Sequence, residues 1–244
     1  RRKPMSNRSL SEWLAWQEKL HPSDIELGLE RVTGVWKQLH PAVFEPFVIT
    51  VAGTNGKGSS VTFLETILRH AGYRTGSYTS PHLLRYNERI RLDGMQANDE
   101  AICAAFERID TCRGDISLTY FEFGTLAALD IFARAGVDVA ILEVGLGGRL
   151  DAVNLLDADA VLVTSIGLDH TEWLGDDLDA IAREKAGVLR REQPAVFAEA
   201  VVPAGFLEAA DESKACVAYL DKDYSYAYQP DGWCWQMGDR VLEL

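Results

Sequence analysis

A glycine-rich stretch constrains the fold of this chain more than any other feature. Phe47–Ala52 is an apolar, β-branched run, and Gly53-Thr-Asn-Gly-Lys-Gly-Ser59 follows it directly. An apolar pattern with helical spacing then starts at Val61. A strand, a glycine loop and a helix N-terminus in this order are typical of phosphate-binding loops, because bare backbone N–H groups and the helix dipole favour an anion there. Lys57 adds a positive charge for the outer phosphates.

The match to the motif G-x-x-x-x-G-K-[ST] is imperfect at two positions. Val51 stands at the first glycine position, and Gly58 separates Lys57 from Ser59. A plain strand–turn–helix connection is the alternative, but it gives no reason for three glycines around one lysine. We therefore predict an NTP-binding loop of a variant kind, with a Ser59 or Ser60 hydroxyl within reach of a metal ion.

Composition and charge argue against several classes of protein. With 244 residues, of which 47% are hydrophobic, the chain can bury a sizeable core. Its net charge of −13 argues against nucleic acid and anionic membranes as partners, so phosphate affinity must be local to one loop. No apolar run approaches the roughly 18 residues that a membrane span needs, and the four cysteines lack a zinc-binding spacing. We expect a cytoplasmic monomer.

Apolar, β-branched runs alternate with helical patterns along most of the chain. The expected strands are 47–52, 73–79, 137–144, 160–166 and 195–198. The expected helices begin after a capping box at Ser9, cover 25–39 behind an Asp24 cap, follow the glycine loop to residue 71, and cover 99–112, 119–135 and 177–190. This alternation predicts an α/β fold with a mostly parallel sheet flanked by helices. A small β-rich segment follows from Val217 to the C-terminus.

Four polar motifs stand at the ends of predicted strands. They are the Gly53 loop, Ser80, Glu143 with Gly145–Gly148, and Asp169-His170. Ligands of parallel sheets bind beyond the carboxyl ends of the strands. We therefore expect these motifs to lie together on one edge of the sheet.

Taken one by one, these residues leave alternatives open. Glu143 interrupts an apolar strand, and a buried carboxylate indicates metal binding, catalysis or a structural ion pair. His170 is a ligand or a loop histidine, and Ser80 on spacing alone simply begins a turn. Lys185 has the pattern of an exposed helix lysine. The Tyr120–Phe123 cluster is more typical of core packing than of a shelf that binds a ring.

Six motifs in a fixed order resemble a known family. They are Gly53-Thr-Asn-Gly-Lys-Gly-Ser59, Ser80-Pro-His-Leu83, Tyr120-Phe-Glu122, Leu142-Glu-Val-Gly-Leu-Gly-Gly-Arg-Leu-Asp-Ala152, Leu168-Asp-His-Thr171 and Arg183-Glu-Lys-Ala-Gly187. The chain resembles the bacterial dihydrofolate synthase/folylpolyglutamate synthases, within the Mur ligase superfamily. The resemblance implies an ATP- and Mg²⁺-dependent amide ligase. Such an enzyme adds L-glutamate to dihydropteroate, and to the γ-carboxylate of folates, through an acyl phosphate.

The resemblance also implies roles for individual residues. The ATP phosphates would be held by Thr54, Asn55, Gly56, Lys57, Gly58 and Ser59. Magnesium would be bound by Ser80, Glu143 and His170. Lys185 would be carried as a carbamate, and Lys57, Glu143, His170 and Lys185 would be the catalytic set. The pterin substrate would contact Asp24, Ile25, Glu26, Leu27, Thr119, Tyr120, Phe121, Glu122, Leu150, Asp151 and Ala152.

The family pattern sets expectations for domains and for rival functions. We expect residues 1–8 to be a disordered, vector-derived N-terminus and residues 9–244 to be one ATP- and pterin-binding domain. Family members carry a second domain that contacts glutamate and ATP, so we expect this chain to bind ATP without ligating. The rivals are a P-loop kinase or NTPase, a folylpolyglutamate synthase without the first activity, and an inactive nucleotide- and pterin-binding module.

Overall fold

An eight-stranded sheet forms the centre of the computed structural model, which describes residues 8–23, 25–169 and 171–243. The strand order is β4-β3-β2-β5-β1-β6-β7-β8. The bounds are β1 Phe47–Ala52, β2 Thr75–Tyr78, β3 Ile90–Leu92, β4 Met95–Gln96, β5 Val139–Glu143, β6 Ala160–Val163, β7 Pro194–Phe197 and β8 Cys216–Tyr219. Strands β3 and β4 are antiparallel to their neighbours, and the other pairs are parallel. The predicted fold class is confirmed.

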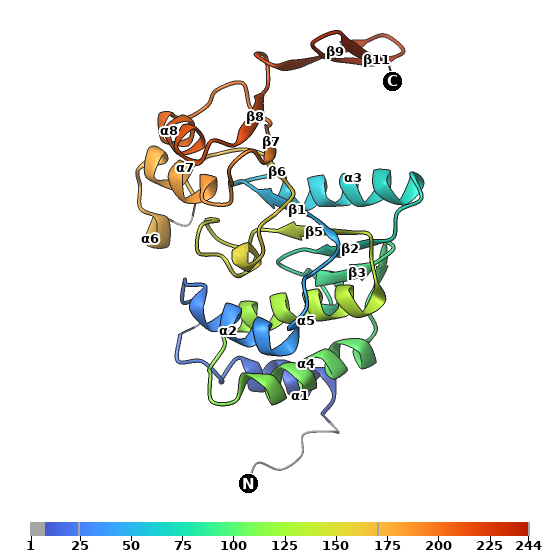
Figure 1. Ribbon diagram of the computed structural model, residues 1–244, viewed down its shortest axis with the longest axis vertical. Helices are drawn as coiled ribbons and strands as arrows, with labels where there is room; N and C mark the ends of the chain where they lie inside the picture. Colours follow the sequence, from blue (N-terminus) through green and yellow to red (C-terminus); the bar gives the residue numbers. More distant parts are fainter. Residues whose placement is uncertain (1–7, 24, 170, 244) are drawn as a thin grey trace.

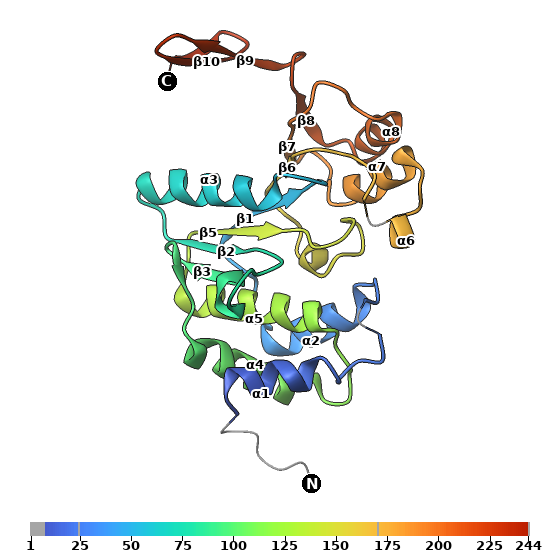
Figure 2. The same ribbon diagram turned by 180° about the vertical axis from the view of Figure 1, so that it is seen from behind.

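Helices cover the sheet unequally on its two sides (Figures 1 and 2). Helix α3 (Lys57–His70) lies alone over the β1–β5–β2 region on one side. On the other side α2 (Glu30–Leu39) and α5 (Tyr120–Ala135) form a layer, and α1 (Leu10–Gln17) and α4 (Asp99–Arg113) lie beyond it. The remaining helices are η1 (Tyr86–Arg89), η2 (Ala152–Leu155), α6 (Thr171–Leu174), α7 (Leu178–Ala186) and α8 (Ala204–Ser213).

The core follows this asymmetry. A large cluster joins the sheet to the thick helical side, and it contains Trp13, Phe106, Phe123 and Phe132. A small cluster of Val51, Val61, Val139 and Ile141 lies under α3. Among the helices in the described ranges, none combines the length and the apolarity of a membrane span.

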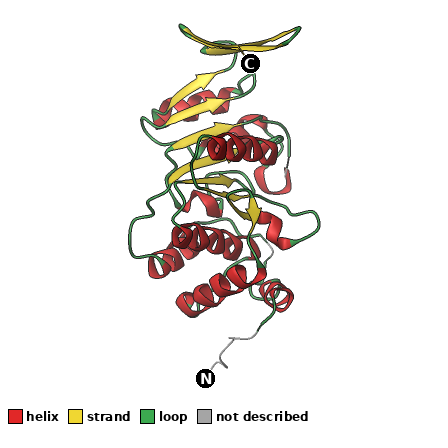
Figure 3. Ribbon diagram, turned by 90° about the vertical axis from the view of Figure 1, so that its right-hand side faces the viewer, coloured by secondary structure: helices red, strands yellow, loops and turns green. Residues whose placement is uncertain are grey.

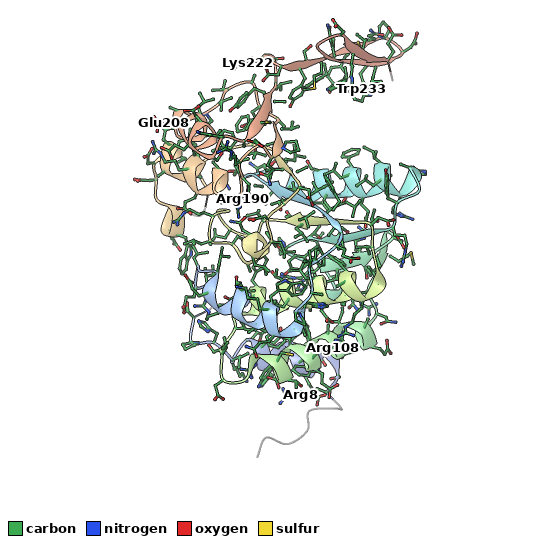
Figure 4. The ribbon with its side chains drawn as sticks, viewed as in Figure 1. Arg8, Arg108, Arg190, Glu208, Lys222 and Trp233 are labelled. Atoms are coloured by element: carbon green, nitrogen blue, oxygen red, sulfur yellow. The ribbon has the colours of Figure 1, made fainter. Side chains whose placement is uncertain are left out.

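A second, antiparallel sheet follows the main one (Figure 3). It consists of β9 (Tyr224–Gln229), β10 (Gly232–Met237) and β11 (Arg240–Glu243) in the order β11-β10-β9. This is the predicted β-rich C-terminal segment. It projects at the opposite end of the molecule from α1, so that Trp233 and Arg8 mark the two ends in Figure 4.

Two expectations about helices were wrong. Helix α2 begins at Glu30 and not at Ile25, because Gly28 has a φ of +155°, which no helix accommodates, and Leu29 is the N-cap. The expected cap, Asp24, lies outside the described residues. Helix α8 was not predicted, and its N-cap is Pro203, which offers no side-chain cap of the kind that Ser, Thr, Asp or Asn would give.

Candidate functional site

The four polar motifs end four neighbouring strands. Strands β2, β5, β1 and β6 are adjacent in that order, and all four are parallel. Their carboxyl ends lead into Ser80, the Glu143–Gly148 segment, the Gly53 loop and residues 164–169, respectively. The expected convergence on one sheet edge is therefore confirmed for the described residues. His170 lies outside them.

The glycine loop between β1 and α3 is fastened to the segment that follows β6. Thr54 N donates to Ser165 O at 2.8 Å, and Gly167 N donates to Thr54 Oγ1 at 2.9 Å. Asn55 N donates to Ser165 Oγ at 2.9 Å. Gly56 precedes the first turn of α3 with a φ of +85°, a conformation that favours glycine. The loop therefore has a fixed shape, with the helix N-terminus open for an anion.

Two lysines converge on one carbonyl oxygen of this loop. Lys57 Nζ donates to Gly53 O at 2.9 Å and to Thr54 O at 3.1 Å. Lys185 Nζ, from α7, donates to the same Gly53 O at 3.0 Å. Two cationic groups at the mouth of a helix N-terminus are suited to a polyphosphate.

The expectation that Lys185 is an exposed helix lysine was wrong, since the residue is only 3% exposed. Glycines bring α7 against the segment after β5. A Cβ on Gly148 would lie 2.8 Å from Glu184 O, and one on Gly187 would lie 2.3 Å from Arg149 Cβ. Burial, assisted by the nearby Lys57 charge, lowers the pKa of Lys185 to about 8. About a tenth of this amine is therefore neutral at pH 7, roughly two orders of magnitude more than for a lysine with the ordinary pKa of 10.5.

Glu143 is a buried carboxylate beside the glycine loop. It is 5% exposed, and its Oε2 accepts a hydrogen bond from Ser80 N at 3.0 Å. A Cβ on Gly58 would lie 3.7 Å from the same oxygen, so Glu143 faces the first turn of α3. Burial raises the pKa of Glu143, and no described cationic side chain lies within ion-pair distance of it. A buried carboxylate with a free coordination position fits the oxygen ligands that Mg²⁺ prefers.

A cavity of about 320 Å³ opens next to Ser80. It is lined by all ten described residues of the expected pterin set: Ile25, Glu26, Leu27, Thr119, Tyr120, Phe121, Glu122, Leu150, Asp151 and Ala152. Asp24, the eleventh, lies outside the described residues. The lining also includes Ser80 and five residues outside the expected pterin set: Gly28, Pro81, Arg89, Gly145 and Leu146. Pro81, Gly145 and Leu146 belong to the quoted motifs and Gly28 follows Leu27, while Arg89 carries no motif signal.

Asp151 and Phe121 form one wall of the cavity. Asp151 Oδ2 accepts from Leu146 N at 2.8 Å, and Oδ1 accepts from Val153 N at 3.0 Å. Its complete burial raises the pKa of Asp151 to about 6, against the opposing effect of these N–H donors. The Phe121 ring packs on Gly145, where a Cβ would lie 2.6 Å from Cζ. An aromatic face beside a buried carboxyl group suits a flat heterocycle with N–H donors.

Another part of the lining is the segment 25–28, which side-chain contacts hold in place. Glu26 pairs with His21 Nε2 at 2.7 Å and with Arg31, and Arg31 lies 3.1 Å from Glu122 Oε1. Gly28 N donates to Leu150 O at 3.3 Å. Glu26 and Glu122, the two acids of this part of the lining, therefore both pair with Arg31, which lies outside the lining.

Comparisons with known proteins agree with this arrangement. The model of the Mur ligase middle domain matches residues 51–205. The dihydrofolate synthase/folylpolyglutamate synthase of Escherichia coli (strain K12) is 49% identical over 243 residues, which cover 100% of this chain and 58% of that protein. The protein of that name from Haemophilus influenzae is 50% identical over 230 residues, which cover 93% of this chain and 52% of the relative.

Solved structures show the same likeness. Escherichia coli FolC in complex with DHPP and ADP has a TM-score of 0.95 and 48% identity, over 99% of this chain and 58% of that one. A bifunctional folylpolyglutamate synthase/dihydrofolate synthase with Mn, AMPPNP and L-glutamate bound has a TM-score of 0.92 and 49% identity, with the same coverage. The chain thus spans somewhat more than half the length of these relatives.

Proposed function

This chain belongs to the Mur ligase middle-domain family, and from that premise we propose that it supplies the ATP- and pterin-binding part of an amide ligase. The ligase adds L-glutamate to dihydropteroate and to the γ-carboxylate of folates. One observation carries the proposal: the glycine loop and the cavity are neighbours, joined through Ser80, which lines the cavity and donates to Glu143 beside the loop. An acid held in the cavity thus adjoins a nucleotide held on the loop. The similarity of the curated relatives and of the FolC complexes supports the choice of substrates.

The reaction has two steps that these residues can support. A carboxylate is a poor electrophile, so a carboxylate oxygen of the acid first attacks the γ-phosphorus of ATP, and ADP leaves. Lys57 and the loop N–H groups stabilise the charge of the transferring phosphoryl group. The glutamate amine then attacks the acyl carbon, loses a proton, and phosphate leaves as the amide forms. No serine or cysteine nucleophile is needed.

Glu143 and Ser80, with His170, would hold magnesium at this site. When bound, the ion neutralises negative charge on the phosphate oxygens. The Ser80 N–H bond favours the ionised form of Glu143, against the burial that raises its pKa.

Lys185 would act as a carbamate. Its neutral amine attacks the carbon of CO₂, a nitrogen–carbon bond forms, and one proton is released. The lowered pKa of Lys185 supports this step, because only the neutral amine is nucleophilic. The product carries a negative charge where the ammonium now contacts Gly53 O.

The test measures ligand binding and turnover on the 244-residue chain. Calorimetry with an ATP analogue and Mg²⁺, with and without dihydropteroate, is expected to show binding of both. Phosphate release is then followed with dihydropteroate, with a folate and with neither, each with and without glutamate. A kinase or NTPase predicts phosphate transfer that ignores glutamate and pterins. Absence of dihydropteroate binding in a folded protein that binds the nucleotide would refute the proposal.

A further inference from the structure

Arg89 places a nearly buried positive charge in the wall of the cavity. It is the last residue of η1, directly before β3, and it is 9% exposed. It lines the cavity beside Ser80 and Pro81. Within the described part of the chain, no carboxylate lies within ion-pair distance of its guanidinium, whose hydrogen bond is to His82. A buried charge without a counter-ion is costly, so the site favours an anion that arrives with a ligand.

The guanidinium is held in a fixed orientation. Its Nε donates to His82 Nδ1 at 2.8 Å. The carbon at its centre lies 5.6 Å from the ring centroid of Tyr86 and 5.5 Å from that of Tyr120. The two ring centroids are 5.7 Å apart, so both rings lie on one side of the group. The Tyr78 hydroxyl also interacts with Arg89. The two terminal nitrogens form a fork of donors that matches a carboxylate.

The charges of the cavity leave one favourable place for an anion. Among the described residues that line it, the ionisable acids are Glu26, Glu122 and Asp151, and Arg89 is the single cation. An acidic ligand is repelled by Asp151 and attracted to Arg89. Arg89 also lies at the Ser80 end, which is the end next to Glu143 and the glycine loop.

We propose that Arg89 binds the carboxylate of the acid substrate, the group that is phosphorylated, and that His82 positions Arg89 for this contact. The inference rests on the proposed function and deepens it by locating the reacting end of the substrate. The flat heterocycle then extends toward Phe121 and Asp151, and the carboxylate faces the nucleotide.

The test compares an acid with its neutral amide on the 244-residue chain. Calorimetry in the presence of an ATP analogue measures the affinity for dihydropteroate and for the analogue with a carboxamide in place of the carboxylate. The variant Arg89→Met keeps an aliphatic side chain beside Tyr86 and Tyr120 and removes the charge. Arg89→Gln is a second variant that also keeps a donor for His82. Arg85→Met is the matched control, because the Arg85 side chain is 68% exposed and lies outside the cavity lining.

The wild-type chain and Arg85→Met are expected to prefer the acid. Both Arg89 variants are expected to lose roughly 10- to 100-fold in affinity for the acid, the usual range for a hydrogen bond to a charged group, and to keep their affinity for the amide. His82→Phe should lower the affinity for the acid by a smaller factor than the Arg89 variants do. Equal loss for acid and amide would assign Arg89 a structural role and overturn the inference, as would an unchanged acid affinity. If the wild-type chain binds neither ligand, the proposed function itself fails, and this inference fails with it.

Discussion

Replacing Lys185 by methionine should make the protein more stable at neutral pH, in spite of the lost hydrogen bond to Gly53 O. The pKa of Lys185 falls from 10.5 to about 8 in the folded protein, chiefly through burial. The folded protein therefore loses this proton near pH 8, and the unfolded chain loses it only near pH 10.5. Between these values the unfolded state binds the extra proton, so wild-type stability rises with pH. Below pH 8 the full penalty of the buried charge is present.

The magnitude follows from the two pKa values. Each pKa unit corresponds to about 1.4 kcal/mol, which gives about 3 kcal/mol for this lysine. Because the residue is almost fully buried, solvent screening reduces this value little. The free energy of unfolding of the wild type, relative to Lys185→Met, should rise by about 3 kcal/mol between pH 7 and pH 10.5.

Urea unfolding across this pH range, in buffer free of CO₂, measures the difference. Subtracting the free energy of unfolding of the variant from that of the wild type removes the contribution of tyrosines and cysteines, because both proteins share their titration. Lys37→Met, at an exposed position of α2, is the control and should show a flat difference. A flat difference for Lys185→Met as well would refute the reasoning. If the stability of the wild type and that of Lys185→Met changed with pH in the same way, the Lys185 ammonium would be as well solvated in the folded protein as in the unfolded chain.

Three further predictions concern the same sheet edge. Lys57→Ala should abolish nucleotide-dependent acyl phosphate formation while the protein stays folded, at a cost of a few kcal/mol in the transition state; retained activity in a folded variant would contradict this role. Glu143→Ala should weaken Mg²⁺ binding measured by titration with an ATP analogue present, and equal affinity in both proteins would remove Glu143 from the metal site. Asp151 keeps its proton up to about pH 6 in the folded state, against 3.8 when unfolded. Wild-type stability relative to Asp151→Asn should therefore fall by about 3 kcal/mol between pH 3.8 and 6, as urea unfolding can measure, and a constant difference would contradict the raised pKa.

The fold could be predicted from the sequence because its signals are local. Continuous apolar strands and caps such as Ser9 and Thr119 specify elements without reference to distant residues. The errors arose where tertiary structure decides. Residues 25–29 have an apolar pattern compatible with a helix, but Gly28 has a φ of +155° and the segment 25–28 lines the cavity, so the helix begins only at Glu30. Helical pattern alone could not show that a cavity lies beneath.

The site was less predictable, because burial is a long-range property. Lys185 stands in a sequence context typical of a surface helix. Its ammonium is buried because Gly148 and Gly187, far apart from each other in sequence, let two backbones approach closely. Arg89 is similar: its neighbours give no motif, and only the fold brings Tyr120 to its guanidinium. For such residues, the contacts that decide burial and orientation come from helices or loops far away in the sequence.

The two departures from the standard phosphate-loop motif have a common structural explanation. Val51, at the position of the first glycine, is fully buried in β1, where it pairs with Glu143 and Leu162 on the flanking strands. The strand therefore continues through the position where the motif would already turn, and the loop begins at Gly53. Because the loop is short, Lys57 reaches back to Gly53 O from the first turn of α3. The same shortness brings that turn against Glu143. Gly58 is the residue that faces its carboxylate, and a Cβ there would already be in van der Waals contact with it at 3.7 Å. Val51 in place of the first glycine and Gly58 as the extra one thus serve the same contact, which places Glu143 of β5 beside the loop that would hold the phosphates.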